Sequence, residues 1–268
     1  MQSGGLLTKE ILKTSQPDKP LITVITVVYN GVENLEQTIL SVVNQTYDNI
    51  EYIIIDGNST DGTLDIIKKY EDKIDYWQSE PDEGIYDAMN KGIKLASGDW
   101  INFMNAGDFF YEKETIQIFI NKIKNNICAD VFYGNSIAIG KMKEVLEEAD
   151  ENLKKLYKGP VFRHNAAFFS TKIHKENLFK TNRKDLGYSL DFKMIYDLYE
   201  KKYIFKKLDF IVVSYQIEGI SYNIWKNNVY NYRVVRDYHY IVATILFLYR
   251  FLKYPVYLIK RRLRECKK

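Results

Sequence analysis

The chain has 268 residues, 46% hydrophobic and 27% charged, a balance typical of a globular protein and not of a disordered one. Its length allows one large domain, or one domain with an appendage, around a sizeable core. The net charge of +3 is uneven: residues 225–268 contain eleven Lys or Arg and two acids, so residues 1–224 are acidic. Because nucleic-acid binding requires a basic face on the folded body, this distribution argues against a nucleic-acid partner.

A polar lead, residues 1–20, precedes a regular alternation of strand-like and helix-like segments. The β-branched run LITVITVVY at 21–29 predicts a buried strand, and apolar positions at helical spacing predict a helix over 33–45. The alternation continues with predicted strands at 49–56, 74–80 and 99–106 and predicted helices at 61–72 and 85–96. Strands that alternate with short helices imply right-handed crossovers, so we expect an α/β fold with a mostly parallel sheet.

Polar residues follow each of these predicted strands at the point where the strand ends. They are Tyr29 and Asn30, residues 56–61, Glu80 and Asp82, and residues 105–108. Ligands of parallel sheets bind beyond the carboxyl ends of the strands. The sequence therefore predicts a binding site along this edge of the sheet.

After Glu112 the pattern is mixed. The segments predict helices at 113–123 and 187–202, a strand pair within 129–145, a short strand at 163–170 and a strand at 203–216. From Trp225 an aromatic-rich helical stretch runs to Tyr254, is expected to break at Pro255, and then resumes. Its most apolar run, IVATILFLY, is too short to span a bilayer.

The phosphate-binding loops of common nucleotide folds are absent. The first predicted strand is followed by VVYNGVEN, which contains neither GxGxxG nor GxxxxGK[ST]. A bound diphosphate would therefore need a metal ion or basic side chains, which directs attention to Asp108 and Lys91. The segment DGNSTDGT at 56–63 is either a capped turn or part of a nucleotide pocket, in which Asp56 accepts a hydrogen bond from a base and Tyr29 stacks on it.

Five segments together resemble the inverting nucleotide-sugar glycosyltransferases of family 2, in their polysaccharide-assembly branch. In chain order they are VITVVYN, QTY, DGNSTDGT, SEPDEGIYDAMNKGI and FMNAGD. The resemblance implies a GT-A fold, in which a nucleotide-sugar-binding half, residues 21–111, merges into an acceptor-binding half, residues 112–224. It also implies an inverting transfer of a sugar from a nucleoside-diphosphate donor, with a UDP-sugar favoured, to a glycan acceptor.

The resemblance also implies roles for particular residues. Those expected to contact the nucleotide or donor are Thr26, Val27, Tyr29, Asp56, Asp82, Lys91, Asn105, Ala106 and Gly107. Asp108, the last carboxylate of the DXD region, is expected to bind Mn²⁺ or Mg²⁺. Many members have two adjacent acids here, whereas this chain has Gly107. Because Mg²⁺ often takes one or two carboxylates and completes its shell with phosphate and water, one Asp and a diphosphate are sufficient.

The second half of the chain resembles the family more loosely. RHNAAFF resembles the acceptor-side segment, where His164 is a second metal ligand, an acceptor contact or a structural histidine. GYSLDFKMIYDL resembles the segment that supplies the catalytic base; Asp191 fits that position best, and Asp197 is the other candidate. Lys193 stands where related sequences often carry a second acid. GISYN, residues 219–223, resembles a loop that closes near the phosphates.

The tail, residues 225–268, combines aromatic and basic residues. Ten aromatics lie between Trp225 and Tyr257, and residues 250–268 contain eight basic residues and one acid. One interpretation is a helix packed on the body with a solvated basic end; the other is a helix lying in a membrane surface. We favour peripheral association with an anionic membrane surface on the inner, cytoplasmic face. The two cysteines, Cys128 and Cys266, show no zinc or disulfide spacing and fit a reducing compartment.

The favoured function is therefore a cytoplasmic, metal-dependent, peripheral membrane glycosyltransferase that acts on a lipid-linked glycan in cell-surface polysaccharide assembly. The alternative is a non-catalytic nucleotide-sugar-binding or scaffolding subunit, which Gly107 and Lys193 keep open. A nucleotidyltransferase is disfavoured because no Gly-rich, Lys-bearing phosphate loop opens the chain.

Overall fold

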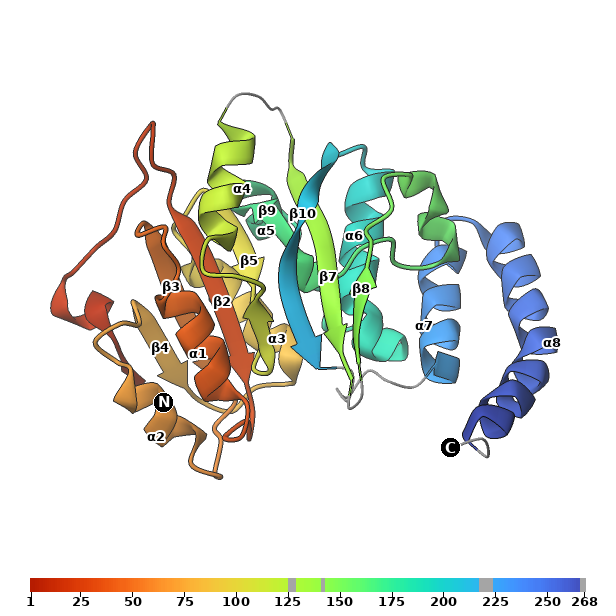
Figure 1. Cartoon of the computed structure of the whole chain (residues 1–268), viewed down its shortest axis with the longest axis horizontal. Coiled ribbons are helices and arrows are strands. Elements are labelled where there is room, and N and C mark those ends of the chain that lie inside the picture. The colour runs from red at the N-terminus through yellow and green to blue at the C-terminus, as the bar shows by residue number, and fades with distance from the viewer. Residues whose placement is uncertain (125–128, 141–142, 217–223, 266–268) are drawn as a thin grey trace.

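The computed structural model describes residues 1–124, 129–140, 143–216 and 224–265. Cys128, Cys266 and the GISYN segment therefore lie outside the described residues. Within the described part, a ten-stranded sheet has the order β1-β4-β3-β2-β5-β9-β7-β10-β6, with β8 paired to β7. Helices cover both faces of this sheet, and two further helices, α7 and α8, lie beyond the end at which β7 and β8 pair (Figure 1).

The first part of the chain forms the predicted alternation. Its elements are β2 (Ile22–Val28), α1 (Leu35–Val43), β3 (Ile50–Asp56), α2 (Thr63–Lys69), β4 (Tyr76–Ser79), α3 (Ile85–Leu95) and β5 (Trp100–Phe103). Strand β2 pairs in parallel with β3 and β5, and β3 pairs in parallel with β4. The predicted α/β fold with a mostly parallel central sheet is thus confirmed.

The polar lead contains structure that the sequence pattern did not predict. Strand β1 (Gln2–Gly4) pairs antiparallel with β4 and occupies the outer edge of the sheet. A short 3₁₀ helix, η1 (Leu6–Lys9), follows it. Three residues are too few to show a strand period, which is why the pattern gave no signal.

The second part of the chain extends the same sheet. Its strands are β6 (Asp108–Phe110), β7 (Val131–Ile139), β8 (Glu144–Glu147), β9 (Ala167–Ser170) and β10 (Phe205–Gln216). Its helices are α4 (Thr115–Ile123), η2 (Leu153–Lys158), η3 (His164–Ala166), α5 (Thr171–Glu176), η4 (Lys184–Ser189) and α6 (Leu190–Glu200). Strand β9 is antiparallel to both β5 and β7, so it joins the two parts, and β10 lies between β7 and β6. The predicted strand at 163–170 is only half strand, because its first residues form η3.

The core lies in two layers, one on each face of the sheet. Along β2, Ile22 and Val24 belong to one hydrophobic cluster, and Ile25 and Val27 belong to the other. A strand covered on both faces buries the side chain at every position, which explains the run of mostly apolar, β-branched residues in the sequence. Helices α1 and α4 cover the face with Ile22, and α3, α5 and α6 cover the opposite face (Figure 1).

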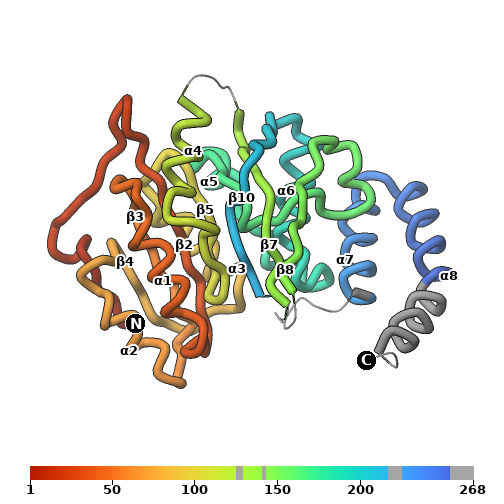
Figure 2. Tube along the Cα trace, in the orientation of Figure 1, coloured from red at the N-terminus to blue at the C-terminus, as the bar shows by residue number. Residues whose placement is uncertain are grey.

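The tail forms two helices, α7 (Ile224–Arg236) and α8 (Tyr240–Glu265), which pack side by side (Figure 2). The predicted break at Pro255 is wrong, because α8 continues through that position. A proline removes one backbone hydrogen bond and can be accommodated within a long helix. The chain turns instead at residues 237–239, where Asp237 pairs with Arg183 and His239 contacts Glu200. Among the described residues no helix is long and apolar enough to cross a membrane.

Candidate functional site

The ends of three parallel strands meet at one edge of the sheet. Val28 at the end of β2 lies opposite Asp56 at the end of β3, and Asp56 lies opposite Ser79 at the end of β4. A side chain at Gly57 would lie 2.7 Å from Oδ2 of Asp82 and 3.3 Å from Cδ2 of Tyr29. The structure therefore brings Tyr29, Asp56 and Asp82 together, and the glycine leaves room for them.

Asp56 is fully buried, and its carboxylate organises the loop that follows it. It accepts hydrogen bonds from the Ser59 backbone N–H (3.0 Å) and from the Ser79 hydroxyl (2.6 Å). The Ser59 hydroxyl also donates to it and in turn accepts from the Asn30 N–H, which ties this loop to the end of β2. The Tyr29 ring is 66% exposed beside this loop and has a free face for stacking.

Two other predicted donor residues have side chains in the core. Thr26 is fully buried, and its hydroxyl donates to the Met104 carbonyl oxygen at 2.7 Å. Val27 is likewise buried in the cluster beneath the sheet. The structure does not bring these two side chains to the exposed edge, and their contact with a nucleotide stays a prediction.

Lys91 lies on α3 facing the end of β4. Its ammonium is 2.9 Å from Glu80 Oε1 and 3.6 Å from Asp87 Oδ2, and it donates to the Pro81 carbonyl oxygen. Partial burial alone would lower the pKa of Lys91, but the nearby carboxylates raise it by more. The Lys91 ammonium is therefore positively charged. Asp82 accepts from the Gly84 N–H, which shapes the turn into α3.

Residues 105–108 form a tight turn between β5 and β6. Gly107 has φ +96°, a conformation that glycine adopts without strain, and its N–H donates to the Thr38 hydroxyl. That hydroxyl donates in turn to the Asp108 carbonyl oxygen at 2.8 Å. Ala106 donates its N–H to the Val27 carbonyl oxygen. The glycine that replaces an expected acid therefore has a conformational role in this turn.

Asp108 begins β6, opposite Tyr215 of β10. Burial raises the pKa of its carboxyl to about 7, against the opposing effects of a hydrogen bond from Asn165 and the charge of Arg163. The side-chain oxygens of Asn105 and Asn165 are buried without a hydrogen-bond partner in the described part of the chain. One carboxylate with amide oxygens is a donor set that suits Mg²⁺ or Mn²⁺. No group of three or more His, Cys, Asp or Glu that could hold a metal occurs among the described residues.

His164 lies in an aromatic cluster. Its ring is 4.8 Å from Phe103, 5.2 Å from Phe169 and 5.6 Å from Phe179, measured between ring centroids. Burial, followed by the charge of His174, lowers the pKa of His164 to about 3, so the imidazole is neutral. These contacts are those of a structural histidine, although its Nε2 is buried without a partner in the described residues. A metal role for it stays a prediction.

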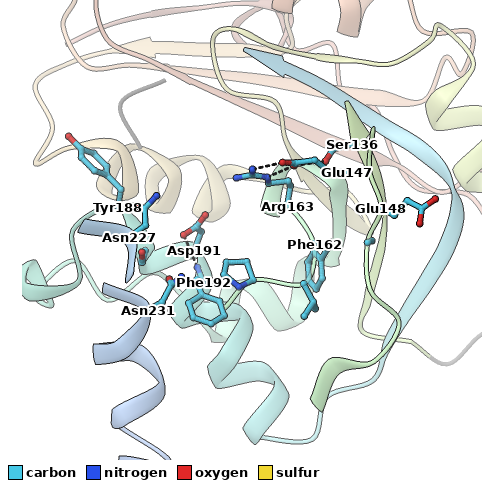
Figure 3. A pocket seen from close by; sticks show the side chains of 15 residues that line it. Ser136, Glu147, Glu148, Phe162, Arg163, Tyr188, Asp191, Phe192, Asn227 and Asn231 are labelled. Atoms are coloured by element: carbon cyan, nitrogen blue, oxygen red, sulfur yellow. Dashed lines mark hydrogen bonds and ion pairs between the residues drawn. The ribbon is translucent and has the colours of Figure 1, made fainter. Parts of the chain in front are cut away.

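A pocket of about 430 Å³ opens beside Asp191. It is lined by Gly134, Ser136, Glu147, Glu148, Ala149, Pro160, Val161, Phe162, Arg163, Tyr188, Ser189, Asp191, Phe192, Asn227 and Asn231. The lining comes from β7, β8, η4, α6, α7 and the segment before η3. Figure 3 shows the Asp191 carboxylate and the Arg163 guanidinium pointing into the same part of this pocket. Polar groups and aromatic rings together suit a sugar.

Asp191 lies in the first turn of α6, where its Oδ1 accepts from the Phe192 N–H at 2.7 Å and from the Tyr86 hydroxyl at 3.3 Å. Burial raises the pKa of Asp191, while the hydrogen bonds to Phe192 and Tyr86 and the charge of Arg163 oppose the rise. A carboxylate with a raised pKa that faces a pocket is suited to accept a proton.

Asp197, the other candidate base, is held in an ion-pair cluster. Its Oδ2 accepts from Lys180 at 2.7 Å, and its Oδ1 accepts from Lys193 and from the Tyr238 hydroxyl. The Lys193 side chain is only 5% exposed in this cluster, and its ammonium also lies 4.5 Å from the centre of the Tyr238 ring. Lys193 therefore has a structural partner one helical turn away and does not contact Asp191.

The sequence interpretation missed the cluster around Arg163. The guanidinium donates to both oxygens of Glu147, from Nε at 2.7 Å and from Nη2 at 2.9 Å, and it lies 4.8 Å from the Tyr215 ring centre. The Tyr215 hydroxyl donates to Glu147 as well. The Arg163 charge lowers the pKa of both Asp108 and Asp191, and Arg163 itself lines the pocket. The one sequence feature that could have indicated a role for Arg163 is its position next to His164, a predicted site residue.

Comparison with known proteins shows which families and sequences this chain resembles. The family model described as "Glycosyl transferase family 2" matches residues 23–204, more than half of the chain. The chain is 34% identical over 182 residues to an uncharacterised glycosyltransferase of Mycobacterium tuberculosis, a match that spans 66% of each chain. It is 27% identical over 255 residues to the putative teichuronic acid biosynthesis glycosyltransferase TuaG of Bacillus subtilis, spanning 91% of this chain and 98% of TuaG.

Solved structures share the fold at low sequence identity. Staphylococcus aureus TarS (residues 1–349), in complex with UDP, superposes with a TM-score of 0.61 at 19% identity, covering 84% of this chain and 65% of TarS. The mannosyltransferase PcManGT of Pyrobaculum calidifontis, in complex with GDP-Man and Mn²⁺, gives 0.61 at 16% identity with the same coverage. These similarities confirm the predicted GT-A fold.

Proposed function

The chain belongs to glycosyl transferase family 2, and on that basis we propose that it moves a sugar from a nucleoside-diphosphate sugar to a glycan acceptor with inversion at the anomeric carbon. The observation that carries the proposal is the position of Asp191, whose carboxylate faces a 430 Å³ pocket and is held there by Tyr86. The pocket takes the acceptor, and the edge of the sheet at Tyr29 and Asp56 takes the nucleotide.

The donor is bound across the ends of β2, β3 and β4. Tyr29 stacks on the base, Asp56 accepts from a ring N–H, and Asp82 and Lys91 face the ribose and phosphates. TarS was solved with UDP and PcManGT with GDP-Man, so nucleotides with either base bind to proteins of this fold. We favour a UDP-sugar for this chain.

A divalent cation, Mn²⁺ or Mg²⁺, would be held by Asp108 together with the donor diphosphate, with Asn105 as a neighbouring oxygen donor. When bound, it offsets the charge that develops on the departing diphosphate. Support comes from the side-chain oxygens of Asn105 and Asn165, which have no partner in the described part of the chain and lie near the half-buried Asp108, and from the Mn²⁺ in the PcManGT complex. Lys91 adds a positive charge on the same edge of the sheet.

Asp191 acts as the base. As the acceptor hydroxyl attacks the anomeric carbon from the side opposite the diphosphate, its proton passes to the Asp191 carboxylate. The C–O bond to the diphosphate breaks, and the electron pair leaves with the nucleoside diphosphate. The hydrogen bond from Tyr86 and the adjacent Phe192 N–H hold the carboxylate in one orientation during this transfer.

The acceptor is a growing cell-surface polysaccharide, attached to a lipid at the inner face of the membrane. The name of TuaG, a putative teichuronic acid biosynthesis glycosyltransferase that aligns over 98% of its length, supports the polysaccharide, whereas the lipid attachment is proposed from the aromatic and basic tail. The alternative is a non-catalytic nucleotide-sugar-binding or scaffolding subunit; the positive φ of Gly107 and the ion pair of Lys193 with Asp197 support catalysis over it by giving both residues a structural explanation.

The test is a donor panel with the purified full chain. UDP-, GDP- and dTDP-sugars are supplied with Mn²⁺ and glycan acceptors, and release of nucleoside diphosphate is measured. Asp191→Asn should abolish release while donor binding, measured by calorimetry, persists. Donor binding without any transfer would indicate a binding subunit, and full turnover in Asp191→Asn would remove the assigned base.

A further inference from the structure

Helix α8 presents an apolar face to solvent. Four aliphatic side chains recur at intervals of three or four residues: Ile241 (72% exposed), Ile245 (62%), Leu248 (55%) and Leu252 (74%). At 3.6 residues per turn this spacing places them in one stripe along the helix. The exposed side chains that flank this stripe are apolar or aromatic at Tyr240, Val242, Tyr249 and Phe251, and Lys253 lies at its border with the ammonium 4.3 Å from the Tyr249 ring centre. We call the eight apolar and aromatic residues the α8 face.

The opposite side of α8 is occupied by α7. The Phe247 ring lies 4.7 Å from that of Tyr232 and 5.7 Å from that of Trp225, and Ala243 is 3% exposed. Arg250 also turns to this side, donating to Asn228 and to the Lys158 carbonyl oxygen. The α8 face is therefore the outer side of a helix that is already anchored, and it does not pack on the body of the protein.

An outer helix side without charge is unusual for a surface in water. No charged residue occurs from Tyr240 to Tyr249, whereas α4, a surface helix of the body, exposes Asn121 and Lys122. Contiguous exposed apolar patches of this kind mark interaction sites. The composition also resembles that of interfacial helices, which have an apolar face, aromatic residues at its borders and basic residues nearby.

We propose that α8 lies in the plane of an anionic membrane with the α8 face inserted below the headgroups. Charge complementarity selects this occupant over a second copy of the chain. Residues 253–268 carry seven basic residues and one acid, which attract anionic headgroups but would repel the same tail of a second copy. The helix need not span the bilayer, and none of the described helices has the length and apolarity to do so.

The position of α7 connects this surface to the pocket. Asn227 and Asn231 of α7 line the pocket beside Asp191, while other side chains of α7 pack on α8. Figure 1 shows α7 between α6 and α8. The pocket is therefore one helix away from the membrane surface, where an acceptor on a lipid carrier would be delivered by diffusion in two dimensions. This second step depends on the proposed transferase function; the membrane contact does not.

Vesicle flotation of the full chain tests the contact. Binding to vesicles of phosphatidylcholine with 30% phosphatidylglycerol is expected, and it should fall with salt and be at least tenfold weaker for pure phosphatidylcholine. The variant with Ile241→Ser, Ile245→Ser, Leu248→Ser and Leu252→Ser should lose at least tenfold in binding. These side chains are exposed, so the fold should persist, which circular dichroism checks. A matched control replaces four exposed aliphatics of the body, Ile11, Leu12, Leu95 and Ile204, with Ser and should bind as the wild type does.

Three outcomes would overturn the proposal: wild-type protein that does not float with anionic vesicles, a four-serine α8 variant that floats equally well, or an α8 face that proves to be a dimer contact. Light scattering distinguishes the last, since the variant would then change from dimer to monomer in the absence of lipid. The reaction is tested separately with a water-soluble acceptor and no vesicles, where the α8 variant should keep wild-type turnover. A protein that floats but transfers no sugar would refute the proposed function and leave the membrane contact standing.

Discussion

The Tyr86 hydroxyl donates a hydrogen bond to Oδ1 of Asp191 over 3.3 Å, although 105 residues separate the two in sequence. Tyr86 belongs to α3, which also carries Lys91 on the donor edge, and Asp191 belongs to α6, which lines the pocket. Helix α3 therefore contributes Lys91 to the edge of the sheet where we propose that the donor binds, and Tyr86 to the position of the proposed base. Tyr86→Phe should lower kcat by about 10- to 150-fold, since a hydrogen bond to a charged group contributes about 1.5–3 kcal/mol, and leave the donor KM unchanged. Unchanged kcat would show that this bond does not position the base.

The two candidate bases should respond differently to the same substitution. Asp191→Asn should remove turnover with little change in stability, because Asp191 has no ion-pair partner among the described residues. Asp197→Asn should instead destabilise the fold by up to about 3–5 kcal/mol, since it breaks a buried ion pair with Lys193. Urea denaturation and nucleotide release, measured on both variants, check this. The assignment fails if Asp197→Asn is as stable as the wild type and inactive.

The pH dependence of turnover follows from the raised pKa of Asp191. The base acts as a carboxylate, so activity is present above its pKa in the folded protein and is lost as pH falls through that pKa. Because burial raises the pKa, the loss should occur above the ordinary value for aspartate, about 3.9. A profile of kcat/KM measured from pH 4 to 8 reports this limb, and a profile without an acidic limb in that range would contradict the assignment.

Arg163 should influence the position of that limb. Its charge lowers the pKa of Asp191, so Arg163→Gln should move the acidic limb of kcat/KM to higher pH. Arg163→Lys keeps the charge but loses the paired bonds to Glu147, and should move the limb less. Arg183→Gln is the matched control, since Arg183 pairs with Asp185 and Asp237 away from the pocket lining. An equal shift in the control would assign the effect to general destabilisation.

Metal binding should depend on nucleotide. Asp108 is the one acidic residue of its turn, so Mn²⁺ should bind weakly to the protein alone and at least tenfold more tightly when UDP is present. Titration calorimetry with and without UDP measures both affinities. Because UDP itself binds Mn²⁺, Asp108→Asn provides the baseline, and it should show no gain over UDP in free solution. Equal affinity of the wild type in both states would contradict this account.

The parts of the fold that could be predicted are those with a long run of mostly apolar residues or with apolar residues at helical spacing. Strands β2 and β3 are seven-residue runs buried on both faces, and the ends of parallel strands necessarily meet, so the grouping of Tyr29, Asp56 and Asp82 follows from the order of elements. Strands β1 and β6 have three residues each and give no period. The predicted break at Pro255 was wrong because the loss of one backbone hydrogen bond does not end a 26-residue helix.

The part of the site that could not be predicted depends on tertiary partners. Arg163, Glu147 and Tyr215 come from the segment before η3, from β8 and from β10, and only the register of the sheet brings them together. A single arginine in a sequence gives no indication of which carboxylate it will pair with. In the same way, Lys193 could not be distinguished from a lost catalytic acid until its contact with Asp197 was seen.

The pairing of β6 with β10 also determines when the turn at residues 105–108 can reach its folded structure during protein synthesis. Among the described strands, β6 pairs with β10 alone, through Asp108 and Tyr215 at one end. The ribosome releases every motif of the nucleotide-binding half about a hundred residues before it releases that partner strand. Pairings so distant in sequence form late, so the nascent chain already contains all the predicted donor-binding segments while Asp108 still lacks its strand partner and contacts only nearby residues such as Thr38 of α1. A fragment ending at residue 111 would remain in that immature state.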